Sequence, residues 1–177
     1  MPHDAHAHEL FFVRAGLDRE NVRKIVAESL TGADDGELFL EYRQSESLAL
    51  DDRQIKSASF DTGLGFGLRS VAGEAQGYAH GSELSEAAIR RAAITVQAVK
   101  SGRSGHLAAG PTGTNAALYT DLNPLALVPF EDKVKLLEEI DSYARSREPR
   151  IKQVSASLAG SWQAVYILRA DGSHAAD

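Results

Sequence analysis

The chain has 177 residues, of which 43% are hydrophobic, so it is long enough to fold around a core of its own. Its 25 acidic residues outnumber the 19 basic ones, and the formal net charge of -6 argues against nucleic acid as a partner. The absence of cysteine excludes disulfides and thiolate metal sites, and no apolar run approaches about 18 residues. With no leader-like start, we expect a cytoplasmic protein without a membrane segment.

The first nine residues contain three histidines, His3, His6 and His8, that follow no helical or strand period. Copper or nickel capture by an amino-terminal histidine would require backbone N–H groups that can be deprotonated, and Pro2 has none. We therefore interpret residues 1–9 as a flexible histidine-containing tail and residues 10–177 as a single domain.

A first helix is predicted to begin at Asp18, because an aspartate at this position can cap the first turn. Apolar residues then return at helical spacing, at Val22, Ile25, Val26 and Leu30. The Thr31-Gly32 pair is expected to end the helix.

The stretch from Glu37 to Gly81 has short apolar runs broken by turn residues, which predicts a β-meander. The expected strands are Glu37–Arg43, Glu46–Asp51, Gln54–Phe60, Gly63–Val71 and Ala75–His80. Each is close to the usual strand length of about 5–6 residues. The adjacent carboxylates Asp51 and Asp52 lie at a turn, and we interpret them as a solvated corner rather than an acid pair.

The fourth of these strands has the clearest pattern. Alternation places one set of side chains, Leu64, Phe66 and Leu68, on a core face. The other face carries Gly65, Gly67 and Arg69, and its glycines predict close approach by another backbone or a helix. Arg69 can either pair with a surface carboxylate or bind a ligand.

On the fifth strand, Tyr78 and His80 alternate with the small residues Gly77 and Ala79. His80 can be a histidine at the rim of the sheet or a ligand-binding residue. Arg69, Tyr78 and His80 are therefore the candidate binding residues of this chain.

A second helix is predicted from Ser85 to Lys100, and its alanine-rich side is expected to close the glycine-lined sheet face. The following stretch, Ser101–Asn115, is rich in Gly, Ser and Thr and predicts an exposed loop. Neither this loop nor Gly63-x-Gly65-x-Gly67 has the spacing of a phosphate-binding or dinucleotide-binding motif.

A third helix is predicted from Phe130 to Arg145, beginning directly after Pro129. The apolar stripe expected to be buried is Val134, Leu137, Ile140 and Ala144. The residues expected to face water are Glu131, Lys133, Lys135, Glu138, Glu139 and Asp141.

The end of the chain predicts a hairpin, with strands Ile151–Ala159 and Trp162–Ala170 joined by a Gly160-Ser161 turn. Asp171-Gly172 is a further turn signal. The segment after it, Ser173–Asp177, is either an element that stops early, as in a truncated chain, or a short edge strand.

These elements supply no complete catalytic or metal-binding constellation. A catalytic zinc needs three protein ligands around an open position. His80, His106 and His174 are far apart in sequence, and no histidine lies one helical turn from Glu138 or Glu139. No catalytic residue and no metal ligand is therefore predicted in this chain.

An ordered series of short motifs nevertheless resembles the amino-terminal half of TldD-type proteins, in the TldD/PmbA family that is also labelled modulator of DNA gyrase. The motifs are Ser45-Glu46-Ser47-Leu48, Lys56-Ser57-Ala58-Ser59-Phe60, Gly65-Phe66-Gly67-Leu68-Arg69, Gly73, Gly77-Tyr78-Ala79-His80 and Leu84-Ser85-Glu86. One departure is Asp52-Arg53, where relatives tend to have Asp-Gly, so the hairpin loop is expected to use another turn type.

The resemblance implies a zinc metallopeptidase that cuts unfolded or extended peptides in the cytoplasm together with a TldE/PmbA-type subunit, or as a homodimer. It also implies that zinc is held through residues beyond Asp177, by a His-Glu-x-x-x-His helix and a cysteine that this chain lacks. The expected function is thus a non-catalytic domain that contributes to a peptide channel and a subunit interface. The alternative is a stand-alone module that binds peptides by β-strand addition.

The residue patterns and the resemblance predict the same architecture. It is an α+β two-layer domain in which helices pack on a mostly antiparallel sheet.

Overall fold

The computed structural model describes residues 2–98, 120 and 122–177, and the predicted loop Ser101–Asn115 lies outside them. The described helical elements are α1 (Pro2–His8), the π-helical turn η1 (Glu9–Val13), α2 (Arg19–Leu30), α3 (Glu86–Gln97), the 3₁₀ turn η3 (Pro124–Ala126) and α4 (Phe130–Arg147). None of them is both long enough and apolar enough to cross a membrane.

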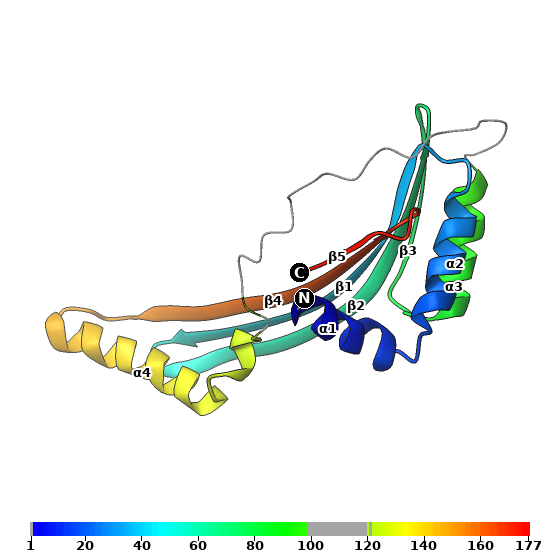
Figure 1. Cartoon of the computed structure of the whole chain (residues 1–177). Coiled ribbons are helices and arrows are strands. Elements are labelled where there is room, and N and C mark those ends of the chain that lie inside the picture. Colours follow the sequence, from blue (N-terminus) through cyan, green and yellow to red (C-terminus); the bar gives the residue numbers. More distant parts are fainter. Residues whose placement is uncertain (1, 99–119, 121) are drawn as a thin grey trace. The chain divides into compact units, whose positions relative to one another are not determined.

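The strands are β1 (Asp35–Asp51), β2 (Gln54–Ala72), β3 (Ala75–Gly81), β4 (Ser155–Arg169) and β5 (His174–Ala176). They form one antiparallel sheet in the order β3-β2-β1-β4-β5 (Figure 1). Helices pack on this sheet, so the predicted α+β fold is confirmed. The last residues contain the short strand β5, which lies at the other end of the sheet from β3.

Three strands are much longer than predicted. β1 has 17 residues and β2 has 19, so each joins two of the short strands expected from the sequence. The hairpin predicted at Gly160-Ser161 is wrong, because the 15-residue β4 runs straight through both residues. A Cβ on Gly160 would lie 2.7 Å from a methyl of Leu125, so this glycine makes room for a neighbour and does not mark a turn.

The contacts group the chain into two compact units, whereas the sequence analysis expected one domain over residues 10–177. Unit 1 comprises residues 1–42, 63–121 and 164–177, and unit 2 comprises residues 43–62 and 122–163. β1, β2 and β4 each contribute residues to both units.

In unit 1, α2 and α3 lie side by side, and α3 contacts β3 (Figure 1). The predicted cap of α2 is confirmed, since the Asn21 backbone N–H donates to Asp18 Oδ1 at 2.7 Å. Ser85 caps α3 in the same way, accepting from the Ala88 N–H at 3.2 Å. The core of the unit includes the predicted Phe66 and Leu68, while Leu64 is only half-buried.

The amino-terminal segment differs from the flexible tail that was expected. Residues 2–8 form α1, in which Ala7 is buried, and the chain continues into η1 with Leu10, Phe11 and Phe12 buried. Burial of these large apolar side chains anchors the segment that precedes them.

Unit 2 has a separate core of Leu48, Leu50 and Leu137, with Ile55, Val134, Ala156 and Leu158 packed against it. The face of α4 that covers this core was predicted only in part, since Leu137 and Val134 lie inside as expected. Ile140, expected inside, is 43% exposed, whereas Lys133 and Asp141, expected outside, are buried. The two charged groups can be buried because Lys133 pairs with Glu46 at 2.6 Å and Asp141 with Arg145 at 2.9 Å.

The β1–β2 turn keeps the geometry of a tight hairpin despite its unusual sequence. Asp52 and Arg53 have φ values of 47° and 70°, and positive φ at both central residues is what a type I′ turn requires. The different turn type expected from Asp-Arg in place of Asp-Gly is therefore not seen.

Candidate functional site

The three candidate binding residues, Arg69, Tyr78 and His80, lie close together on one face of the β2–β3 hairpin. Arg69 stands opposite Tyr78, and Gly67 stands opposite His80, in an antiparallel register that puts opposed side chains on the same face. The Tyr78 and His80 rings stack, with centroids 5.7 Å apart and planes 28° apart. Tyr78 is 57% exposed, so this face is open to a ligand. A binding role for the three residues stays a prediction.

Arg69 makes ion pairs with β1 carboxylates. Its Nε donates to Glu37 Oε1 at 2.7 Å, and its Nη2 donates to Glu37 Oε2 at 2.9 Å and to Asp35 Oδ2 at 3.0 Å. Arg169 of β4 donates to the other Asp35 oxygen at 2.7 Å. The hydrogen bond with Glu37 raises the pKa of Arg69 above its usual value. The guanidinium is thus engaged by two carboxylates, which leaves it poorly suited to capture an anion.

Gly67 is covered by Tyr78 and not by α3, contrary to the expectation that the helix would close the glycine-lined face. A Cβ on Gly67 would lie 2.8 Å from the Tyr78 phenolic oxygen. α3 instead lies on the Phe66 side of the hairpin, where Ala88 and Ala92 line a groove together with that ring. The reason is that α3 presents an apolar stripe, which packs against β3 on the side of the hairpin that carries Phe66 rather than on the glycine side.

The groove beside β3 holds about 380 Å³ and is lined by residues of β2, β3 and α3. Its apolar surfaces come from Phe66, Ala79, Ala88 and Ala92, and its polar lining from His80, Ser82, Glu83, Arg91 and Thr95. Glu83 and Arg91 form an ion pair at 3.6 Å in which both side chains are about two thirds exposed, at 69% and 66%. His80 lines the groove and also stacks on Tyr78, so it belongs both to the groove and to the face that carries the candidate binding residues.

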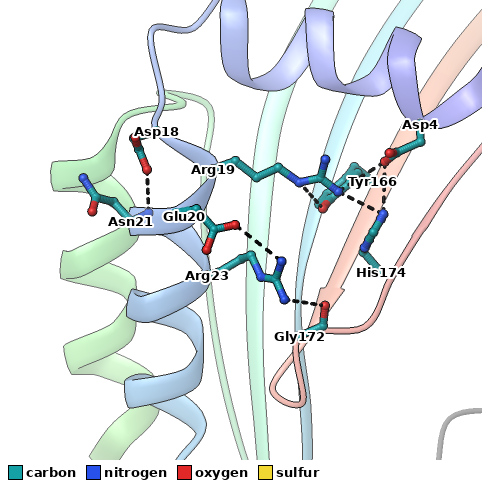
Figure 2. A network of polar contacts seen from close by, with 9 residues as sticks. All are labelled: Asp4, Asp18, Arg19, Glu20, Asn21, Arg23, Tyr166, Gly172 and His174. Carbon is teal, nitrogen blue, oxygen red and sulfur yellow. Dashed lines mark hydrogen bonds and ion pairs between the residues drawn. The ribbon is translucent and has the colours of Figure 1, made fainter.

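A second polar cluster in unit 1, which the sequence analysis missed, is centred on Arg19 of α2 (Figure 2). Its Nε donates to the Tyr166 hydroxyl at 3.2 Å, and its Nη2 lies 3.3 Å from Asp4 Oδ1 and 2.9 Å from His174 Nε2. The His174 ring stacks on Tyr166 at 5.5 Å, and burial raises the pKa of Tyr166. The cluster ties α1 and α2 to β4 and β5.

No sequence signal could have found this cluster, because its members lie as far apart along the chain as Asp4 and His174. Arg23 makes a neighbouring link by donating to the Gly172 carbonyl at 3.3 Å, at the turn before β5 (Figure 2). We interpret both contacts as structural, because they join α1 and α2 to β4, to β5 and to the turn between these strands.

The described residues do not fit a zinc ion. Within residues 2–98, 120 and 122–177 there is no group of three or more histidine, aspartate or glutamate side chains placed to hold a metal. The nearest carboxylate–imidazole pair is Asp4 with His174 at 3.1 Å. The Arg19 guanidinium touches both groups, so its positive charge opposes a cation there.

Two family models match the chain. One, described as PmbA/TldA metallopeptidase domain 1, matches residues 36–100, and the other, described as PmbA/TldA metallopeptidase central domain, matches residues 123–177. The Haemophilus influenzae protein named Metalloprotease TldD homolog is 34% identical to this chain over 148 residues. A protein of the same name from Buchnera aphidicola is 27% identical over 146 residues. Each match covers 81% of this chain but 30% of the relative, so the chain spans less than a third of their length.

Solved structures have the same fold. A protein named as a modulator of a DNA gyrase from Thermotoga maritima superposes with a TM-score of 0.72 at 9% identity, over 94% of this chain and 37% of that one. TldE from Thermococcus kodakarensis superposes with a TM-score of 0.66 at 15% identity, over 89% of this chain and 36% of that one. At these identities the likeness shows the fold alone.

Proposed function

Because the chain belongs to the TldD/PmbA metallopeptidase family, we propose that it forms the amino-terminal, non-catalytic part of a TldD-like zinc metallopeptidase. The substrates are unfolded or extended peptides. The chain contributes to the channel through which they pass and to the interface with another subunit. Zinc is held by residues beyond Asp177 in the longer protein.

One observation carries this proposal. The chain matches TldD homologues over 81% of its own length, yet its described residues place no metal-binding group. A family whose chemistry depends on a metal needs ligands with fixed geometry, and we infer that those ligands come from another part of the longer protein.

The proposed partner is a TldE/PmbA-type subunit or a second copy of the chain. The likeness in fold to TldE supports a partnership between subunits of similar architecture. The competing function is a stand-alone peptide-binding module, and the position of β3 at one end of the sheet order favours it.

The test is zinc analysis after dialysis together with cleavage of an unfolded, alkylated protein by the 177-residue chain. We expect neither stoichiometric zinc nor cleavage that a chelator blocks. The double variant Asp4→Ala, His174→Ala is the matched control, since it removes the nearest carboxylate–imidazole pair. One tightly held zinc per wild-type chain with chelator-sensitive cleavage would refute the proposal.

A second measurement separates the two functions. Sedimentation of the chain with a TldE-type subunit is expected to yield a stable complex if the chain is a metallopeptidase domain. Saturable peptide binding by a chain that remains monomeric in this mixture would favour the stand-alone module instead.

A further inference from the structure

We propose that the outward side of α4 is a self-association surface, on which a second copy of this chain packs its own α4 in antiparallel orientation. This inference rests on the proposed function for a second copy as the partner, and it assigns that subunit contact to one helix. Three features of α4 carry it, namely an exposed apolar row, opposite charges at the two ends of that row, and a pattern that matches itself when two copies run antiparallel.

α4 has more apolar surface than its contact with the sheet uses. The side that packs on the core of unit 2 carries Leu137 and Val134 (Figure 1). Three further large side chains, Leu136, Ile140 and Tyr143, follow at spacings of four and three residues and so lie in one row along the helix. They are 47%, 43% and 61% exposed. A row of exposed apolar side chains on an otherwise charged helix is typical of a contact surface.

The two ends of this row carry opposite charges. Asp132 lies four residues before Leu136, in the acidic first turn, and Arg147 lies four residues after Tyr143, in the basic last turn. The Arg147 guanidinium lies over the Tyr143 ring, 5.0 Å from its centre. The contact of Asp132 with Lys135 at 3.3 Å is exposed and therefore weak, so it leaves the carboxylate available to a partner.

This pattern matches itself when two copies of α4 run antiparallel. Over the full 18 residues of the helix, the first turn of each copy then lies beside the last turn of the other. Asp132 of each copy meets Arg147 of the other, while Leu136 lies beside the turn that holds Ile140. The opposed helix dipoles add to the attraction. A parallel pair would instead bring like charges together at both ends. The charges therefore favour a second copy in antiparallel orientation.

The association is expected to be weak. A single pair of helices buries less than the roughly 800 Å² per partner of a standard interface. Glu139 lies beside the row near the middle of α4 and faces its own copy across the two-fold axis, which lowers the affinity further. We expect a monomer–dimer equilibrium with a Kd on the order of 100 µM.

The first test is sedimentation velocity of the full 177-residue chain at concentrations from about 5 to 500 µM, which bracket this Kd. Ile140→Glu places a charge in the middle of the row and should weaken self-association about tenfold or more. Ser142→Glu is the matched control, because it adds the same charge at an exposed position on another side of the helix. It should change the Kd by about twofold or less.

The second test exchanges the end charges. Asp132→Arg alone and Arg147→Asp alone each put like charges at both ends of the antiparallel pair, so each should self-associate about fivefold more weakly or worse. An equimolar mixture of the two variants restores opposite charges at both ends and should associate about as tightly as wild type. Circular dichroism shows whether each variant folds. If a charge variant does not, Ile140→Glu and Ser142→Glu still test the surface.

A chain that stays monomeric over the whole concentration range, a dimer that Ile140→Glu leaves intact, or a mixture that associates no better than its components would overturn the inference. These outcomes leave the proposed function standing if the zinc assay and the complex with a TldE-type subunit come out as expected. A zinc-loaded, active chain would refute the proposed function and leave the self-association of α4 to be judged on its own result.

Discussion

Tyr78 lies across Gly67 of the neighbouring strand, with its phenolic oxygen 2.8 Å from the place that a Cβ would occupy. A glycine inside a strand lowers its stability, because the backbone loses more freedom and no side chain packs. Here the missing side chain lets the Tyr78 ring lie flat on the sheet, where it stacks with His80. The glycine is thus part of the surface on which the candidate site is built.

Replacing Gly67 by alanine is expected to change the free energy of unfolding by less than about 1 kcal/mol. The clash involves the end of an exposed tyrosine that can turn away, and alanine recovers about 0.5–1 kcal/mol of backbone entropy. Gly36→Ala is the contrasting variant, because its Cβ would lie 2.5 Å from the Arg69 carbonyl oxygen and 2.6 Å from Leu30. It should cost about 1–3 kcal/mol through overpacking. If urea denaturation showed the same loss in free energy of unfolding for Gly67→Ala and Gly36→Ala, this distinction would be contradicted.

Phe66→Ala should lower the free energy of unfolding by about 3–5 kcal/mol, since the ring is 5% exposed and forms part of the core beside α3. Phe60→Ala on the same strand is the matched control, because Phe60 is 58% exposed and should cost about 0.5 kcal/mol or less. Thermal and urea unfolding of both variants measure the difference. A Phe66→Ala variant as stable as wild type would remove Phe66 from the core.

Arg53→Gly is expected to stabilise the chain by about 1 kcal/mol. Arg53 has φ of 70°, a left-handed conformation that costs a residue with a side chain about 1–2 kcal/mol. Its contact with Asp141, at 3.9 Å and with a 71% exposed arginine side chain, offsets little of this cost. Arg53→Ala separates loss of the Asp141 contact from relief of the left-handed backbone, since it removes the charge and keeps the Cβ. A gain from alanine equal to that from glycine would show that the backbone is not the cause.

The sequence allowed the starts of α2, α3 and α4 to be predicted, because they depend on local patterns. Asp18 marks its helix by a cap that involves only its own first turn. Strand alternation put Tyr78 and His80 on one face of β3 for the same reason, but only the observed register shows that Arg69 shares that face. Strand lengths could not be predicted, because Gly160 resembles a turn residue until its contact with Leu125 is known.

Long-range contacts explain the remaining differences between the predicted and the observed structure. Arg19 meets Tyr166 and His174 only after α2 packs near β4 and β5, so no spacing in the sequence reveals that cluster. The buried face of α4 was predicted only in part, because Lys133 and Asp141 were taken as solvated charges. Each is buried against a specific partner, and such pairing overrides the ordinary preference of charged residues for the surface.

The pair of Lys133 and Glu46 offers a direct test of this last point. Their side chains are only 8% and 15% exposed, the Nζ to Oε1 distance is 2.6 Å, and Lys133 also donates to the Leu125 carbonyl at 2.8 Å. Removing one partner leaves a buried charge without compensation. Glu46→Leu alone and Lys133→Met alone should therefore each lower the free energy of unfolding by about 3–5 kcal/mol, because each leaves the opposite charge buried without its partner.

The double variant Glu46→Leu, Lys133→Met should recover most of the loss, since two apolar groups of similar size can replace a buried ion pair at little cost. Lys135→Met serves as the control on the same helix, because its contact with Asp132 at 3.3 Å is exposed and should be worth less than about 1 kcal/mol. Urea denaturation of the wild type, the two single variants and the double variant gives the coupling free energy between the partners. A coupling near zero would mean that Lys133 is buried for its aliphatic stem alone, and that the orientation of α4 does not depend on the ion pair.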